Sequence, residues 1–222
     1  MATEISNTGI KHKDQRVGVF IDVQNMYYSA KALYGRKVNF GEILKTAVAD
    51  RKLIRALAYV VRATGEEDPF FEALNQRGIE TKERELQEFH GGQKKADWDV
   101  GITVDAIRIS NVLDVVVLVS GDGDFVELVE YLKHHGKQVE VVAFRRSTST
   151  RLVEAADDFV DLGSDNKYLI GAYSARSKPV TKHTTTSKKT EPESSSDSFW
   201  LPPADDSRGF SGTAKKKSPR KK

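Results

Sequence analysis

The stretch "DVVVLVSGDGDF" (114–125) joins a run of apolar residues to two aspartates that flank a glycine. A short apolar run that ends in turn residues predicts a strand that is buried on both faces. Asp122 and Asp124 follow at the end of that strand, and two like charges about 4 Å apart repel by about 4 kcal/mol at an effective dielectric of about 20. Something nearby must offset this repulsion, or one aspartate must face away from the other.

Strand and helix patterns alternate on both sides of this stretch. Further strands are expected at 17–22, 53–63, 79–86, 137–144 and 159–162, and the polar character of 79–86 places it nearer a sheet edge. Helices are expected at 25–35, 39–51, 69–78, 96–110, 124–136 and 148–159. This alternation predicts an α/β fold with a central parallel sheet and helices on both faces.

Composition limits the class of protein. The chain has 222 residues, no cysteine and no apolar run near the ~20 residues that cross a bilayer. The absence of cysteine excludes disulfides, thiolate metal sites and cysteine nucleophiles. The first residues have no apolar core of a secretion signal, so we expect a cytoplasmic protein.

The charge is divided unevenly along the chain. Residues 175–222 carry 12 Lys/Arg and 5 Asp/Glu, a net charge of +7, and the remaining 23 basic and 27 acidic residues give the body −4. We expect a flexible lead-in at 1–15, one domain at 16–173 and a disordered Ser/Thr/Lys-rich tail at 174–222, because the tail has too few apolar residues to order itself. "SFWLPP" (198–203) is the apolar exception in the tail.

Aspartates fall where a parallel sheet places its ligands. Asp22 ends the first strand, Asp122 and Asp124 follow the central strand, and Asp97 and Asp99 lie at the start of a helix. The carboxyl ends of parallel strands share one edge, where ligands gather. Mg²⁺ binds carboxylates, water and substrate phosphate through oxygen, and it would offset the repulsion among these acids. Near them, Asn25 could contact a phosphate oxygen, and Lys94 and Lys95 could contact a nucleic-acid backbone.

Each of these residues also has a purely structural interpretation. Asp124 could cap the helix that follows it, and the helix dipole favours Asp99 in a first turn. A lysine pair on a loop is often simply solvated. Asp105 is six residues from Asp99 and therefore on another helix face, so a pair with Arg108 is the simpler role. Tyr27 could stack on a base, although packing in the core is the commoner role of an aromatic residue.

The motifs, taken in order, resemble a known family. "FIDVQNMYYSA", "KKADWDVGITVDAIRIS", "VVVLVSGDGDFVELVEYLKHHGKQVEVVAF" and "TSTRLVEAADDFVDL" are similar to NYN domains of the LabA-like type, over about residues 16–163. The resemblance implies a PIN-like three-layer sandwich and a nuclease that uses Mg²⁺ or Mn²⁺, usually on RNA. By motif position it implies that the catalytic, metal-binding acids are Asp22, Asp99, Asp122 and Asp124, with Asn25 beside Asp22.

Three functions remain open from the sequence. The first is a metal-dependent ribonuclease, the second is a non-catalytic RNA-binding or regulatory protein that keeps the acidic pocket, and the third is a phosphohydrolase of small molecules. The basic tail favours a nucleic-acid partner, because Lys/Arg contacts bind polyanions and a small substrate needs no such tether. The tail could also bind a protein through "SFWLPP". No feature predicts the oligomeric state.

Overall fold

Six parallel strands form the central sheet. The computed structural model describes residues 11–62, 69–85, 87–88, 94–95 and 97–172. The strand order is β4-β3-β1-β7-β8-β9. The strands are β1 (Arg16–Asp22), β3 (Lys52–Arg62), β4 (Glu80–Glu85), β7 (Val115–Val119), β8 (Gln138–Ala143) and β9 (Asp158–Asp161). The polar strand β4 lies at an edge, as the sequence predicts.

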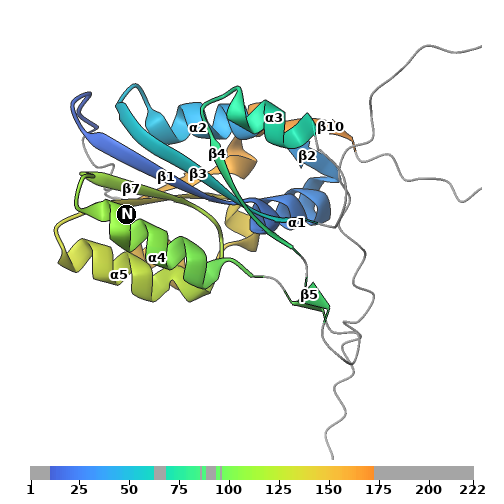
Figure 1. Ribbon diagram of the computed structural model, residues 1–222. Helices are drawn as coiled ribbons and strands as arrows, with labels where there is room; N and C mark the ends of the chain where they lie inside the picture. The colour runs from blue at the N-terminus through green and yellow to red at the C-terminus, as the bar shows by residue number, and fades with distance from the viewer. Residues whose placement is uncertain (1–10, 63–68, 86, 89–93, 96, 173–222) are drawn as a thin grey trace, which may run out of the picture.

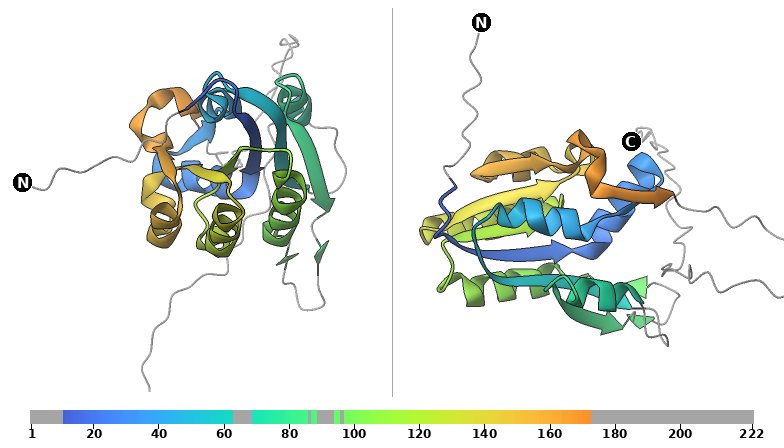
Figure 2. Two further views of the ribbon diagram at one scale, coloured as in Figure 1. Left: turned by 90° about the vertical axis from the view of Figure 1, so that its left-hand side faces the viewer. Right: turned by 90° about the horizontal axis from the view of Figure 1, so that it is seen from above.

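Helices cover both faces of this sheet. Figure 1 shows α2 and α3 on one side and α4 and α5 on the other, and Figure 2 shows the same layers from two further directions. The helices are α1 (Val23–Tyr34), α2 (Phe40–Val48), α3 (Pro69–Asn75), α4 (Asp99–Ser110), α5 (Val126–His134) and α6 (Thr150–Ala155). The predicted α/β fold with a central parallel sheet is therefore confirmed.

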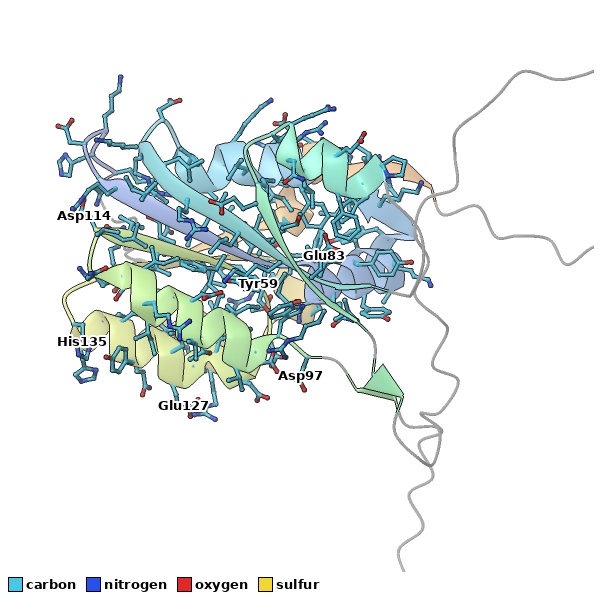
Figure 3. The ribbon with its side chains drawn as sticks, viewed as in Figure 1. Tyr59, Glu83, Asp97, Asp114, Glu127 and His135 are labelled. Carbon is cyan, nitrogen blue, oxygen red and sulfur yellow. The ribbon has the colours of Figure 1, made fainter. Side chains whose placement is uncertain are left out.

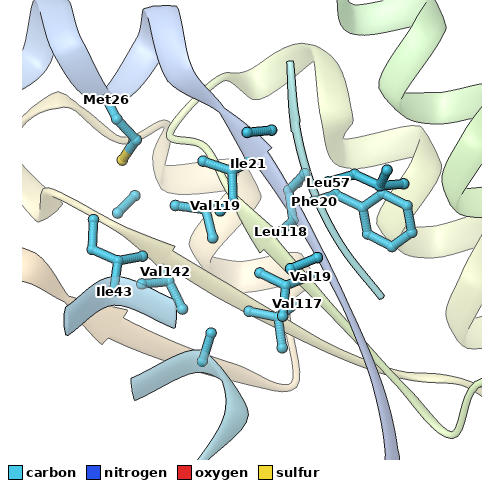
Figure 4. Packing of buried hydrophobic residues seen from close by; sticks show 14 of the residues in the cluster. Val19, Phe20, Ile21, Met26, Ile43, Leu57, Val117, Leu118, Val119 and Val142 are labelled. Atoms are coloured by element: carbon cyan, nitrogen blue, oxygen red, sulfur yellow. The ribbon is translucent and has the colours of Figure 1, made fainter. Parts of the chain in front are cut away.

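The core lies between the sheet and its two helical layers. Every residue of β7 is buried, as are residues 17–22 of β1. In Figure 4, Val19, Phe20 and Ile21 of β1 pack beside Val117, Leu118 and Val119 of β7. Both faces of the central strands are covered, which explains why their sequences are continuous apolar runs rather than alternating ones.

Short elements were not predicted from the sequence. β2 (Arg36–Val38) pairs antiparallel with β10 (Leu169–Ala172), and β5 (Gln87–Glu88) pairs antiparallel with β6 (Lys94–Lys95). Strands of two to four residues have no measurable period, and β2 meets its partner from the far end of the domain. Helix α4 begins at Asp99 rather than residue 96, and α5 begins after the 3-10 helix η1 (Gly123–Phe125).

The direction in which successive strands are added to the sheet reverses between β1 and β7. From β1 the chain adds β3 and β4 on one side, and it then returns to place β7, β8 and β9 on the other side. In open α/β sheets a ligand crevice forms outside the carboxyl ends of the two strands at such a switch point. Asp22 ends β1, and the turn with Asp122 and Asp124 follows β7.

Two predictions concern residues outside the described ranges. The tail at 174–222 and most of the lead-in at 1–15 lie there. Within the residues that the structure describes, no helix is long and apolar enough to cross a membrane.

Candidate active site

Asp22 links β1 to α1 at the carboxyl edge of the sheet. Its side chain caps α1, because Oδ1 accepts a hydrogen bond of 3.0 Å from the backbone N–H of Asn25. Oδ2 accepts one of 3.3 Å from the hydroxyl of Ser120, which follows β7. Only 8% of Asp22 is exposed. Asp22 is thus a buried carboxylate that connects the two strands at the switch point.

The turn after β7 is tied to the same place. The Gly121 N–H donates to Oδ1 of Asn25 at 2.9 Å, and the Asp122 N–H donates to Oγ of Ser120 at 3.2 Å. Oδ1 of Asp122 in turn accepts from the Asp124 N–H at 3.0 Å, so Asp122, and not Asp124, caps η1. The interpretation of Asp124 as the cap of the following helix is wrong, because the N-cap residue of α5 is Phe125 and no side chain caps that helix. The amide of Asn25 fastens the turn to α1.

Asp99 completes the group of charges that act on Asp22. The pKa of Asp22 is raised to about 6, chiefly by burial and then by the charges of Asp99 and Asp122, against the lowering effect of the bonds from Asn25 and Ser120. Asp99 and Asp122, from two other segments of the chain, therefore lie near enough for their charges to act on Asp22. Desolvation of Asp22 is a larger cost than its repulsion by Asp99 and Asp122.

Aromatic packing holds the start of α4, and with it Asp99. The indole N–H of Trp98 donates to the carbonyl of Val60 at 2.9 Å, and its ring meets that of Tyr59 at a centroid distance of 5.3 Å. The guanidinium carbon of Arg84 lies 4.3 Å from the Trp98 ring centroid. A Cβ at Gly101 would come within 2.5 Å of the Trp98 ring, so this helix position requires glycine.

Asp105 has partners that the sequence did not reveal. Its Oδ2 accepts from the hydroxyl of Tyr59 at 2.9 Å and from Nζ of Lys82 at 2.6 Å. The predicted pair with Arg108 is therefore wrong. Tyr59 stands opposite Asp22 in the register of β1 and β3, and Lys82 stands opposite Tyr59 in the register of β3 and β4. The network anchors α4 to the strands beside the site.

The other predicted residues lie at the margin. Asp124 is exposed. Among the described residues, its charge is not one of those that raise the pKa of Asp22. Figure 3 shows Asp97 at the amino end of α4, where its carbonyl accepts from Arg84. The backbone of Lys94 and Lys95 forms β6, and their side chains lie outside the described part. Tyr27 is buried, which favours a packing role over stacking on a base.

The acids match the donor chemistry of a hard divalent cation. Asp22, Asp99 and Asp122 offer carboxylate oxygens, the ligands that Mg²⁺ prefers, and their repulsion favours a cation among them. As placed, no three Asp, Glu, His or Cys side chains of the described residues stand close enough together to hold an ion. The donor types fit a metal, and a metal site there is a proposal.

Comparison with known proteins identifies the family. The family model of the NYN domain matches residues 16–164. The chain belongs to the NYN domain family. NYN domains are part of the PIN-like nuclease group, which typically uses divalent metals, so the family carries a nuclease or RNA-related role.

Two relatives agree with this assignment. The low amplitude and bright protein LabA of Synechococcus elongatus is 29% identical over 171 residues, which cover 71% of this chain and 89% of LabA. A crystal structure of a protein of unknown function from Vibrio parahaemolyticus is 34% identical with a TM-score of 0.64, and the match covers 73% of this chain and 100% of that protein. The predicted resemblance to LabA-like NYN domains is confirmed.

Proposed function

We propose that this protein is a metal-dependent ribonuclease that hydrolyses phosphodiester bonds in RNA at the carboxyl edge of its sheet. One observation carries the proposal: Asp22 and Asp122 flank the switch point between β1 and β7, and the charges of Asp99 and Asp122 act on a buried Asp22. A buried acid that neighbouring acids repel is typical of functional sites, because a fold gains no stability from it.

The acids have distinct proposed roles. Asp22, Asp99 and Asp122 would hold Mg²⁺ or Mn²⁺, and the exposed Asp124 would bind a second ion or orient a water molecule. The metal would supply an activated water and neutralise charge on the phosphate. Asn25 holds the turn of Asp122 against α1, and this contact keeps the acids in place. Lys94 and Lys95 remain proposed contacts to the RNA backbone.

Burial and hydrogen bonding support Asp22 and Asp122 as metal ligands. Asp22 has the raised pKa and the buried carboxylate, so it gains most from a neighbouring cation. Each oxygen of its carboxylate accepts one described hydrogen bond. A carboxylate oxygen has two lone pairs, so each can accept a further bond or bind a cation. Asp122 is half-buried, and the bond to Asp124 occupies one of its oxygens. Asp22 and Asp122 can therefore each keep their structural bonds and still offer a ligand.

A cleavage assay tests the function directly. We expect wild-type protein to cut a labelled single-stranded RNA in Mn²⁺ and to stop when a chelator is added. Asp22→Asn and Asp122→Asn should lose cleavage, because each removes one ionised ligand while an amide can still accept the capping bond. Asp14→Asn is the matched control. Asp14 is exposed and precedes β1, so it lies at the amino ends of the strands, away from the proposed site. Equal cleavage by Asp122→Asn and Asp14→Asn would contradict the proposed role of the acids.

The alternative function is RNA binding without catalysis. It is favoured by the absence of three converging metal ligands among the described residues. Wild-type protein that binds RNA in chelator and does not cleave it with Mn²⁺ or Mg²⁺ would establish this alternative.

A further inference from the structure

The loop of residues Arg145–Ser149 (the arginine loop) lies against the candidate active site. It leaves β8 at the same carboxyl edge, one strand beyond β7, and it begins with the 3-10 helix η2 (Arg145–Ser147). The Ser149 N–H donates to the carbonyl of Gly121 at 3.0 Å. A Cβ on Gly121 would come within 2.9 Å of Oγ1 of Thr148. The arginine loop is therefore in contact with the turn that carries Asp122.

Hydrogen bonds fix the shape of the arginine loop. The hydroxyl of Thr148 donates to the carbonyl of Phe144 at 2.8 Å, and the Arg145 N–H donates to Oδ1 of Asp161 at 3.0 Å. Phe144 is fully buried and packs against the ring of Tyr34 from α1. The loop thus presents its side chains from a defined backbone, and a ligand would not have to order it first.

The two guanidinium groups of this loop are exposed and available. No carboxylate pairs with Arg145 or Arg146 in the part of the chain that the structure describes. The guanidinium carbon of Arg145 lies 5.5 Å from the ring centroid of Phe159, a cation–π contact that uses no N–H donor in a hydrogen bond. Arg16 and Arg51, in contrast, direct their guanidinium groups to carboxylates.

We propose that Arg145 and Arg146 bind the phosphate backbone of single-stranded RNA and guide it past Asp122. This inference rests on the proposed function and adds a substrate-binding surface to it. The body of the protein is negative and the acids at the ends of β1 and β7 repel phosphate, so an RNA strand needs positive contacts beside them. Arginine suits this role because its planar fork of N–H donors matches two phosphate oxygens.

Binding in the absence of metal tests this surface separately from cleavage. We would titrate the full-length chain into a labelled single-stranded RNA of mixed sequence, with EDTA, at several salt concentrations. The test variant is Arg145→Gln with Arg146→Gln. The control is Lys13→Gln with Lys52→Gln, which removes the same charge from exposed positions at the amino edge of the sheet. Arg146→Gln alone serves as a second test variant, because its side chain has no partner in the described ranges.

The expected effect follows from counterion release. Each lost phosphate contact lowers the salt slope of single-strand binding by about 0.7, so the double variant should lose about 1.4 from the slope and bind about 25-fold more weakly near 0.1 M salt. Arg146→Gln should lose about half of that slope, and the lysine control should keep the wild-type slope.

Several outcomes decide the proposal. An unchanged slope in the double variant, an equal loss in the lysine control, or no RNA binding by wild-type protein would each overturn it. Arginine-dependent binding without cleavage in Mn²⁺ would support the binding surface and reject the nuclease function.

Discussion

Asp22→Asn should stabilise the metal-free protein at neutral pH. Burial and the neighbouring acids raise the pKa of Asp22 from 3.8 to about 6, so the folded protein binds this proton more tightly than the unfolded chain. Stability is therefore lost as the pH rises from the unfolded value through the folded value. Two units of pKa correspond to about 3 kcal/mol of unfolding free energy at neutral pH.

The asparagine removes this cost but also one acceptor. Its amide oxygen can still cap α1 by accepting from Asn25, whereas the bond from Ser120 must reorganise, at a cost of about 1 kcal/mol. We therefore expect a net gain of about 2 kcal/mol at neutral pH and a gain near zero, or a small loss, below about pH 4.5.

Urea unfolding of both proteins in EDTA, at a series of pH values, measures this difference. The difference in unfolding free energy between Asp22→Asn and wild type should grow by about 2 kcal/mol between about pH 4.5 and pH 7.5. Asp14→Asn gives the background, because its exposed carboxylate should produce a flat difference. A flat difference for Asp22→Asn as well would refute the reasoning, since it would mean that the Asp22 carboxylate pays no penalty for its charge.

Three further changes test other parts of the structure. Glu140→Ala should cost about 3–5 kcal/mol in urea unfolding, because it leaves the guanidinium of Arg51 buried and unpaired; a loss below about 1 kcal/mol would contradict this. Asp105→Asn should cost about 1–2 kcal/mol through its lost ion pair with Lys82, and an unchanged melting temperature would argue against that pair. Removal of 175–222 should weaken RNA binding most at low salt and leave turnover at saturating RNA unchanged, and equal salt slopes would exclude a nucleic-acid role for the tail.

The sheet was predictable because its signal is local. Continuous apolar runs mark β1 and β7, and apolar runs broken by one charged residue mark β3 and β8. Placing Asp22 and Asp122 at one edge needed only the rule that parallel strands end together. Neither step required knowledge of which strands are neighbours. That knowledge came from the structure, which sets β1 beside β7.

The missed contacts depend on register, which the sequence does not encode locally. Asp105 meets Tyr59 from 46 positions away and Lys82 from 23 positions away. A helical wheel places Asp105 on a different face from Asp99, but it cannot say which strands that face will meet. Arg145 and Arg146 carried a usable signal, because they directly follow an apolar strand at the same edge as Asp122.

Two opposing requirements meet in the carboxylate of Asp22. As the cap of α1 it must accept the Asn25 N–H, and this bond favours the charged form. Because it lies between β1, β7 and α1 it is also desolvated, and desolvation favours the neutral form more strongly. With a pKa of about 6 the group is still about nine-tenths ionised at pH 7. An ordinary exposed cap would hold the helix without this penalty, so capping alone does not account for the burial of Asp22 beside Asp99 and Asp122. A cation at this edge would account for it, since the same charges that destabilise the metal-free fold would then be its ligands.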